Sequence, residues 1–365
     1  MKSLWPIKKL GEICELVRGS EPGSESYFDE INEERIRFIR VGDISGKVDQ
    51  PKFIDKKLSN LVVVNPDEIL ISFDGTPGIV ARGWSGAIAS GIRVIRDIKP
   101  EILKEFLFYY LQTSEPQKVI KFYTTGVTIL HASRAIPHIK IPLPPLKIQQ
   151  KIVERLDAIK KVQELNDKQI ELAEELFQSL LHRELDPKGK KWEVKRIKQI
   201  LSSQKFTVGK LNRDKYQKSG QIPIIDQGDN EIAGYSDNKN LVYTGELPIV
   251  IYGDHTRIVK YVDFPFIIGA DGVKILNPKK EILIPKYLYY ALHCFNVESR
   301  GYKRHFPILK EKEIPLPPLE TQQKIVEKLS AVQEYKNKLL DQKQKLQELF
   351  ESVLNKSFSR ILEYR

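Results

Sequence analysis

The chain has very little cysteine: only Cys14 and Cys294 occur among its 365 residues, so no framework of disulfide bonds holds the fold together. It also has no long apolar run, since none approaches the roughly 20 residues that a membrane-spanning helix needs. The first residues, MKSLWPIKKLGEI, lack the apolar core of a secretory signal peptide. We therefore expect a cytoplasmic protein that is stabilised by ordinary hydrophobic cores.

Motifs that carry catalysis are missing as well. The stretch Asp74-Gly-Thr-Pro-Gly lacks the Lys and Ser/Thr of a phosphate-binding P-loop. The six histidines are scattered, no Cys/His spacing indicates zinc, and no Gly-rich dinucleotide motif follows a predicted strand. Asn65-Pro-Asp and Asn277-Pro-Lys differ from the Asn/Asp-Pro-Pro-aromatic stretch of amino-methyltransferases, and we interpret both as turns. We expect no catalytic residues, no metal site and no cofactor in this chain.

What the sequence does contain is one long repeat. Residues 141–156 read IPLPPLKIQQKIVERL and residues 314–329 read IPLPPLETQQKIVEKL, with 13 of 16 positions identical. The same offset persists further along, where ELFQSLL at 175–181 matches ELFESVL at 348–354. A period of this length is too long for a solenoid repeat and indicates a duplicated half-protein.

Both copies of the repeat predict a long helix. Three prolines, Pro142, Pro144 and Pro145, exclude a helix before Leu146, because proline lacks the amide donor and restricts the residue before it. Apolar side chains then alternate at spacings of four and three, the heptad pattern of a coiled coil. They are Ile152, Leu156, Ile159, Ile170, Ala173, Phe177 and Leu180 in the first copy, and Ile325, Leu329, Val332, Leu339, Leu346, Phe350 and Val353 in the second. A helix over residues 147–183 would be about 55 Å long at roughly 1.5 Å per residue.

Two heptad patterns in one chain most simply pack against each other. The long segment between them permits either parallel or antiparallel pairing. Antiparallel pairing would place Gln163 near Lys343, and Asn166 near Leu339. Polar residues in such a seam cost stability but can fix its register, unless they merely flank it.

Residues 1–140 and 190–312 predict two globular domains of the same α+β fold. Each contains β-branched and aromatic runs bounded by turn residues, such as IRFIRVGDI, LVVVNPDEILISF, IPIIDQGDN and LPIVIYGD, which predict strands. Each ends with one predicted helix, EFLFYYL at 105–111 and KYLYYAL at 286–292. The two segments also align weakly, with Ala89-Ser-Gly-Ile-Arg matching Ala270-Asp-Gly-Val-Lys and Tyr109-Tyr110 matching Tyr289-Tyr290. Residues 141–189 and 313–365 are the two helical regions.

Positive charge belongs to the second of these domains. The whole chain has a formal net charge of +11. Residues 190–312 hold 22 Lys and Arg against 13 Asp and Glu, a net +9, whereas residues 1–140 hold 20 against 18, a net +2. A basic domain favours a polyanionic partner, most simply nucleic acid, although solubility alone would also account for the charge.

The pattern resembles the specificity subunit of type I restriction-modification systems. The resemblance rests on the paired IPLPPL-x-x-QQKIVE(R/K)L segments, the long helices behind them, and the openings Trp5-Pro-Ile-Lys-Lys-Leu and Trp192-Glu-Val-Lys-Arg-Ile. FIRVGDI at 38–44 also looks like the core strand motif of that family, whereas IPIIDQGD at 222–229 departs from it. The resemblance covers essentially the whole chain.

The resemblance implies a DNA-reading subunit without catalysis of its own. Two target-recognition domains, 1–140 and 190–312, would each bind one half of a bipartite, asymmetric site in double-stranded DNA. The two helices would form an antiparallel coiled coil that sets the half-site spacing. Two modification (methyltransferase) subunits would dock on it, and restriction (translocase and nuclease) subunits would join them. S-adenosylmethionine, ATP and magnesium would serve those partners, so the chain itself needs no cofactor.

Specific reading of DNA needs Arg, Lys, Asn or Gln at base edges, whereas phosphates accept any donor or cation. We expect such residues in predicted strand-end turns and in the loop before each long helix. In the first domain the candidates are Arg40, Thr76, Thr124, Thr125, Thr128, His131 and Arg134. In the second domain they are Gln227, Asn230, His255, Thr256, Arg257, Arg300, Tyr302, Lys303, Arg304 and His305. Taken singly, each candidate is more often a solvated loop residue, and this alternative is weaker for the cluster of cations at 300–305.

Other hypotheses stay open beside this one. The chain could be the specificity subunit of a related type II-like or modification-only DNA methyltransferase system. An enzyme acting alone on DNA would require a cofactor site, and the sequence shows none. A coiled-coil scaffold that links two protein-binding domains would show no DNA binding and little salt dependence of its partner interactions.

Overall fold

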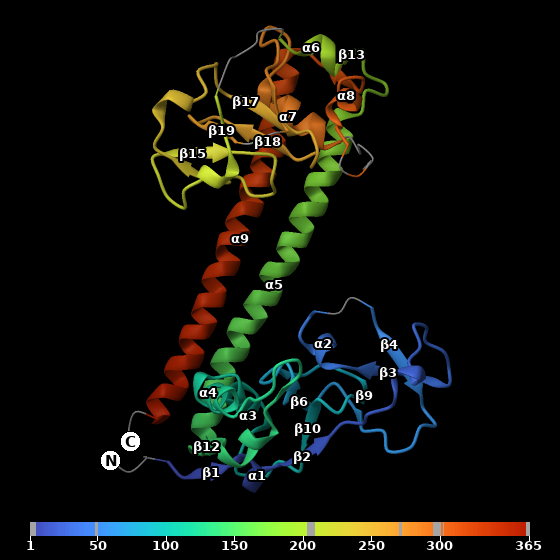
Figure 1. Cartoon of the computed structure of the whole chain (residues 1–365), viewed down its shortest axis with the longest axis vertical. Coiled ribbons are helices and arrows are strands. Elements are labelled where there is room, and N and C mark those ends of the chain that lie inside the picture. The colour runs from blue at the N-terminus through green and yellow to red at the C-terminus, as the bar shows by residue number, and fades with distance from the viewer. Residues whose placement is uncertain are drawn as a thin grey trace. The chain divides into compact units, whose positions relative to one another are not determined.

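The computed structural model describes residues 5–47, 50–202, 209–269, 272–294, 301 and 303–362, with side chains as far as Phe358. The chain divides into two compact units, residues 1–165 with 343–365 and residues 166–342. Each unit contains one globular lobe and one half of a pair of long helices, α5 (Leu146–Leu185) and α9 (Leu319–Leu362) (Figure 1). The predicted α+β class, with two similar lobes and two long helices, is confirmed.

The first lobe contains two four-stranded sheets. One has the order β2-β10-β6-β8 with every pair antiparallel, and the other has the order β4-β3-β9-β5, in which β3 and β9 run parallel. Strand β6 is buried on both faces, because Ile69 and Ile71 join one core cluster and Leu70 another. The strands are β2 (Glu15–Arg18), β3 (Arg35–Ile39), β4 (Lys52–Asp55), β5 (Val63–Val64), β6 (Ile69–Ser72), β8 (Val80–Ala81), β9 (Gly86–Ile88) and β10 (Ile92–Arg96).

Short helices complete the first lobe. Helix α3 (Lys104–Leu111) is the predicted one, but a second helix, α4 (Ser114–Phe122), follows it and was not expected. Its first turn carries Glu115, whose charge suits a helix start, and Pro116, whose missing amide needs no partner there. The motif FIRVGDI was predicted as a strand with turn residues. Strand β3 ends at Ile39, and α2 (Val41–Ile44) makes a helical turn.

The second lobe repeats this arrangement with one sheet of three strands and one of four. Strand β17 is central in the antiparallel order β18-β17-β20, and a second sheet has the order β14-β19-β15-β16. Strands β15 and β19 run parallel, as β3 and β9 do in the first lobe. The elements are β14 (Lys210–Leu211), β15 (Ile222–Ile225), β16 (Gly234–Ser236), β17 (Ile249–Gly253), β18 (Val259–Val262), β19 (Ile267–Gly269), β20 (Val273–Leu276), α7 (Pro285–His293) and α8 (Phe306–Leu309).

A two-stranded sheet joins each lobe to its long helix. In the first unit β1 (Ile7–Lys9) pairs with β12 (Lys140–Pro142), and in the second unit β13 (Glu193–Arg196) pairs with β21 (Glu313–Leu316). The short helices α1 (Leu10–Ile13) and α6 (Ile197–Ile200) follow β1 and β13. The two sequence features that repeat most clearly, the Trp openings and the Ile-Pro-Leu-Pro segments, therefore pair with each other. Proline is tolerated in them because both strands lie at a sheet edge.

The first glutamine of each Gln-Gln pair is the most deeply buried polar side chain of the repeat. Gln149 is 0% exposed; its amide group donates to the carbonyls of Glu101 and Pro144, at 2.9 and 2.8 Å, and its Oε1 accepts the Leu103 amide at 2.8 Å. Gln322 is 0% exposed and repeats the pattern with Ile282, Pro317 and Ile284. Leu103 and Ile284 are the N-cap residues of α3 and α7. Each glutamine therefore ties the start of a long helix to the start of the lobe's own helix.

The side-chain bonds of two tyrosines also correct the alignment of the two lobes. Tyr109 donates to Asp157, and Tyr290 contacts Ser330 at 3.0 Å. Asp157 and Ser330 occupy the same position in the two copies of the repeat. Tyr109 therefore corresponds to Tyr290, one position further along than the predicted pairing with Tyr289. The predicted alignment of Tyr109-Tyr110 with Tyr289-Tyr290 was wrong by one residue.

The long helices run antiparallel within each unit. In the second unit the partners of Asn166, Glu174 and Glu184 on α9 are Leu339, Lys336 and Lys328, in descending order. The predicted contact of Asn166 with Leu339 is confirmed, since the Asn166 amide donates to the Leu339 carbonyl at 3.1 Å. In the first unit Gln163 bonds to the Leu346 carbonyl at 3.2 Å, one turn of α9 beyond Lys343, its expected neighbour. Within the described residues, no helix has the length and apolar character needed to cross a membrane.

Candidate nucleic-acid interface

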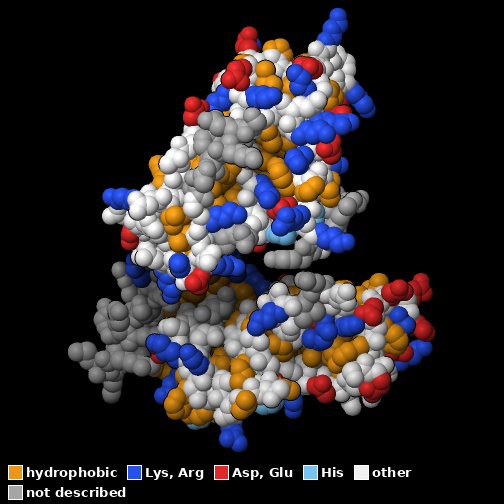
Figure 2. Space-filling view, turned by 45° about the horizontal axis from the view of Figure 1, so that its top comes forward, with side chains coloured by type: hydrophobic (Ala, Val, Ile, Leu, Met, Phe, Trp, Pro, Cys, Tyr) orange, Lys and Arg blue, Asp and Glu red, His pale blue; other side chains and the backbone are white. Residues whose placement is uncertain are grey.

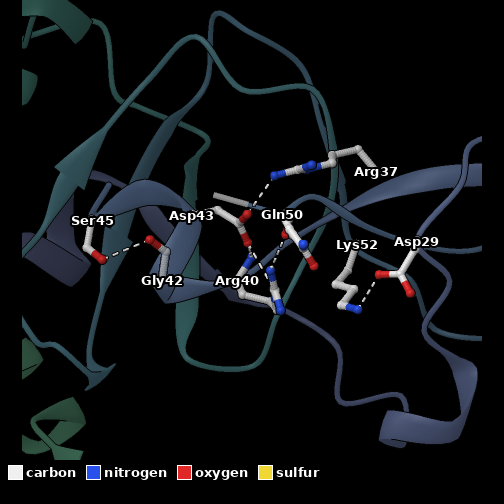
Figure 3. A network of polar contacts seen from close by, with 8 residues as sticks. All are labelled: Asp29, Arg37, Arg40, Gly42, Asp43, Ser45, Gln50 and Lys52. Atoms are coloured by element: carbon white, nitrogen blue, oxygen red, sulfur yellow. Dashed lines mark hydrogen bonds and ion pairs between the residues drawn. The ribbon is translucent and has the colours of Figure 1, made fainter. Parts of the chain in front are cut away.

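The turn that follows β3 is built around one buried carboxylate. Asp43 is 5% exposed and accepts hydrogen bonds from the backbone amide and the Nε of Arg40, at 2.8 and 3.1 Å, and from Arg37 at 2.5 Å (Figure 3). The same guanidinium of Arg40 donates to the Gln50 carbonyl at 2.9 Å. Arg40, a predicted DNA contact, is therefore held firmly in a half-buried position at the end of the strand.

A second polar group lies where β7 (Asp74–Gly75) pairs with β11 (Leu130–His131). The Asp74 carboxylate lies 2.8 Å from Nδ1 of His131 and 3.7 Å from the guanidinium of Arg93. Arg93 is only 6% exposed, and it also donates to the hydroxyl of Ser133 at 3.0 Å. This buried arginine therefore contacts both the strand-end loop and the segment before α5. The side chain of His131 is 60% exposed at the surface beside it.

Residues 125–131 form a hairpin loop that reaches into solvent. Thr125 and His131 exchange backbone hydrogen bonds of 2.9 and 2.8 Å, and Gly126 has a φ of +105°, which favours glycine. The tip displays no charge and exposes Val127, Thr128, Ile129 and Leu130.

The other first-lobe candidates lie around this hairpin. Thr76 follows β7, and Thr124 lies two residues beyond α4, where its hydroxyl donates to the Ile120 carbonyl of that helix at 2.8 Å. Arg134 is exposed in the 3-10 turn that follows the hairpin. Val41 lies against Gly75, so the Arg40 turn adjoins β7. The structure thus brings three separate segments of predicted contacts to one side of the first lobe.

The second lobe assembles the corresponding loops with different side chains. The Oε1 of Gln227 accepts the His255 amide at 3.1 Å, and the Thr256 hydroxyl donates to the Gln227 carbonyl at 2.6 Å. Arg257 closes this turn with a φ of +68°, a conformation that non-glycine residues seldom adopt. Four predicted contacts from two distant segments are therefore adjacent.

Asp254 connects this turn to the segment before α9. Its carbonyl accepts the His305 amide at 2.8 Å, and its carboxylate accepts the Phe306 amide at 2.8 Å and lies 3.4 Å from the Lys274 ammonium. Burial by itself would raise the pKa of Asp254, but the Phe306 amide and the Lys274 charge together hold it below its ordinary value. The carboxylate stays ionised and holds the two loops together.

One predicted contact is wrong for a simple reason. His305 is 0% exposed, and its Nδ1 lies 3.0 Å from the Asp254 carbonyl, so its ring supports the loop and cannot reach DNA. Lys303 and Arg304, the two residues before it, are exposed. The candidates Arg300 and Tyr302 lie outside the described residues. Asn230 is exposed near the Gln227 turn, and its carbonyl accepts the buried Lys260 ammonium at 2.5 Å.

The same backbone bond organises both lobes. The Ala132 amide donates to the Phe73 carbonyl at 2.7 Å in the first lobe, and the His305 amide donates to the Asp254 carbonyl at 2.8 Å in the second. Ala132 and His305 are separated by the offset of the repeat, so they occupy equivalent positions. Both lobes therefore present equivalent loops on one scaffold. Lys and Arg side chains are scattered over the visible face of the second lobe, in the upper part of Figure 2, and outnumber the acidic side chains there, in keeping with its positive net charge.

A family model of the type I restriction modification DNA specificity domain matches residues 2–175 and, a second time, residues 189–349. The two matches together cover most of the chain. The chain belongs to this family of type I specificity subunits. Each copy of the domain takes in one lobe and most of the long helix that follows it.

Relatives of this specificity subunit match it along nearly its whole length. The type I restriction enzyme MjaVIII specificity subunit of Methanocaldococcus jannaschii is 25% identical over 98% of this chain and 92% of its own. The S subunit of a type I restriction-modification system from M. genitalium shares the fold with a TM-score of 0.62 at 14% identity, covering 98% of this chain and 96% of its own. A chain from a structural study of complex assembly in the type I R-M system has a TM-score of 0.60 at 20% identity, covering 98% and 99%.

The sequence reasoning missed two cations that hold the loops of this specificity subunit, one buried and one partly exposed. Arg93 and Lys274 occupy matching positions in the two lobes and bind Asp74 and Asp254. Their signal was present, because both stand at the same place in the aligned stretches that begin at Ala89 and Ala270. Among the described residues, no group of three or more His, Cys, Asp or Glu is placed to hold a metal ion.

Proposed function

We propose that this chain is the DNA-reading subunit of a type I restriction-modification complex, and that each lobe binds one half of a bipartite site in double-stranded DNA. One observation carries the proposal: equivalent loops, held by equivalent bonds, display different side chains in the two lobes. A scaffold that keeps its geometry while its exposed donors change suits the reading of two different sequences. The two half-sites are therefore unlike each other.

Base and phosphate contacts come from the exposed members of these loops. The hydroxyl, imidazole and guanidinium groups of the first lobe suit both phosphates and base edges, and the second lobe adds an amide side chain and more cations. In the first lobe we propose Arg40, Thr76, Thr124, Thr125, Thr128, His131 and Arg134. In the second lobe we propose Gln227, Asn230, His255, Thr256, Arg257, Lys303 and Arg304, with Arg300 and Tyr302 adjoining them in sequence.

The paired helices set the distance between the half-sites. Each lobe is joined to its own part of the pair by a two-stranded sheet and by one buried glutamine, so a lobe cannot turn freely on its helix. Helix α5 has 40 residues and is about 60 Å long at roughly 1.5 Å per residue. Adding the same number of helical turns to both copies of the repeat would lengthen the DNA spacer.

The chain reads DNA but carries out no chemistry. We propose functional boundaries at 1–140 and 190–312 for the target-recognition domains, and at 141–189 and 313–365 for the helical regions that dock two modification subunits. Restriction subunits complete the cytoplasmic assembly. S-adenosylmethionine, ATP and magnesium are bound by those partners.

A mobility-shift experiment with the complex of this chain and its modification subunit tests the proposal. Binding must be selective for one bipartite sequence over scrambled DNA of the same length, and it must weaken steeply as salt increases. Equal affinity for all sequences would contradict the reading function. Arg196→Ala is a suitable control, because Arg196 pairs with Glu311 and Glu313 at the helix junction, away from the proposed loops.

A further inference from the structure

Three aromatic rings form a frame beside the helix pair in the first unit. The rings of Phe108 and Tyr109 have centroids 5.4 Å apart, and those of Tyr109 and Phe350 lie 6.1 Å apart. The ammonium group of Lys160 lies over this frame, at 4.8, 5.1 and 5.7 Å from the three centroids. Arg82 lies over the Phe108 ring as well, at 4.6 Å. The aromatic frame of the first unit is therefore occupied by cations of the chain itself.

The second unit contains the same aromatic frame. Tyr289 and Tyr290 have centroids 5.3 Å apart, and Tyr290 and Phe177 lie 5.9 Å apart, close to the corresponding distances in the first unit. The residue that corresponds to Lys160 in the second copy of the repeat is Gln333. Within the part of the chain that the structure describes, no Lys or Arg lies over these three rings.

A cavity of about 470 Å³ opens where the cation is missing. Both tyrosines of the frame line it together with Gln333, and so do three carboxylates, Asp229, Glu231 and Glu334. The carboxylates lie close enough to the rings that Glu231 contributes to raising the pKa of Tyr289, after burial and Tyr290, and Glu334 contributes to raising the pKa of Tyr290 after burial. The surface charge is also reversed, because Lys160-Lys161 of the first unit corresponds to Gln333-Glu334 of the second.

Two lysines, Lys260 and Lys286, line this cavity beside the carboxylates. Burial lowers the pKa of Lys260, and the charges of Asp226, Asp229 and Glu231 oppose this shift. Lys260 is buried, donates to the Asn230 carbonyl at 2.5 Å and lies 3.9 Å from Asp226. Lys286 lies over the ring of Tyr261, 5.5 Å from its centroid, and precedes Tyr289 by three residues on α7. Among the described residues, Asp229, Glu231 and Glu334 have no ion-pair partner within 4.0 Å. The cavity thus has three carboxylates against two ammonium groups beside the rings of Tyr289 and Tyr290.

We propose that this cavity receives an arginine or lysine side chain of the modification subunit when that subunit docks. Aromatic faces attract cations, and desolvation inside a cavity strengthens the attraction. The three carboxylates add to it and oppose the entry of a phosphate, which excludes nucleic acid as the occupant. In the first unit Lys160 and Arg82 already lie over the corresponding rings. Docking of a partner's cation is therefore proposed for the second unit alone. The proposal rests on the function proposed above.

Binding of the full-length chain to its modification subunit tests this inference, with calorimetry at low and high salt. Gln333→Lys supplies the second unit with the cation that Lys160 supplies in the first, and we expect it to fill the cavity and to weaken binding about tenfold, or about 1.4 kcal/mol. Glu334→Gln removes one carboxylate and is expected to weaken binding by a smaller factor and to reduce its salt dependence. Gln344→Lys is the matched control, because it adds the same charge to an exposed position of α9 away from the cavity.

The outcomes separate this inference from the function proposed for the chain. If the unaltered chain does not bind the modification subunit, the proposed function itself fails. If the unaltered chain binds, and both Gln333→Lys and Glu334→Gln bind with the same affinity as the unaltered chain, the cavity is not a docking site. An equal loss in Gln333→Lys and Gln344→Lys would point to general repulsion and would also overturn the inference. Should Gln333→Lys fail to fold, the affinity and salt dependence of Glu334→Gln decide the question.

Discussion

Replacing the buried glutamine of either repeat should destabilise the contact between lobe and long helix in its own unit only. Gln149→Ala removes three hydrogen bonds at a fully buried position, and Gln322→Ala removes the equivalent three. A typical hydrogen bond contributes about 1 kcal/mol net, and a buried group left without a partner costs about 1–3 kcal/mol. We therefore expect each substitution to lower the free energy of unfolding of its unit by about 3 kcal/mol.

The next residue in the sequence is the matched control. Gln150 and Gln323 are exposed, and the side chain of each bonds to the glutamate four residues further along. Gln150→Ala and Gln323→Ala change the same side chain on the same helix, and should alter stability by no more than about 0.5 kcal/mol, as is usual for surface positions.

Hydrogen exchange followed by mass spectrometry can locate the effect. Gln149→Ala should accelerate exchange in α3 and leave α7 unchanged, whereas Gln322→Ala should do the reverse, because the two glutamines bond to the starts of these two helices. Similar losses for the buried and the exposed glutamines, or acceleration in both units from one substitution, would refute the reasoning.

Three further predictions concern the second unit. Arg304→Ala and Arg257→Ala should each weaken specific DNA binding by about 1–3 kcal/mol if they contact bases, as measured by mobility shift beside Arg196→Ala; unchanged affinity and site preference would remove them from the set of contacts. The pKa of Asp254 is lowered in the folded chain, so its contribution to stability is present above its ordinary pKa of 3.8 and is lost as the pH falls below that value. The free energy of unfolding, measured from neutral to acid pH, should therefore fall less steeply below this pH in Asp254→Asn than in the unaltered chain. Asn166→Leu should raise the denaturation midpoint, because the Oδ1 of Asn166 is buried without a partner, and should also weaken the register of the helix pair; a lower midpoint would contradict this.

The parts of the fold that depend on local chemistry were predictable from the sequence. The prolines before Leu146 place the start of α5 at that residue, and the heptad pattern, for an antiparallel pair, gives the contact of Asn166 with Leu339. Gln227 and Thr256 were predicted DNA contacts because both lie at predicted strand-end turns, and the structure brings them into contact. Periodicity and turn residues act over a few positions, which is why they can be read from a single sequence.

The remaining features depend on contacts between distant segments. The sequence did not show that the strand ends before Arg40, because the turn there is stabilised by the buried carboxylate of Asp43. The burial of His305 depends on Asp254, 51 residues away, and a histidine in a basic loop gives no sign of this in its own neighbourhood. The one-residue shift at Tyr109 was hidden for the same reason, since only its bond to Asp157 fixes the register.

The core of the first unit has an unusual order of synthesis. Phe350, Leu354 and Phe358 of α9 belong to the same hydrophobic cluster as Phe106 and Tyr110 of the first lobe. Residues 166–342, by contrast, form a contiguous unit that is translated in between. At about 5–20 residues per second, the ribosome needs roughly 10 to 35 seconds to pass from one part of this core to the other. The domain that emerges first is thus the last to be completed, and during that interval its apolar surface is available to chaperones or to misassembly with a neighbouring nascent chain.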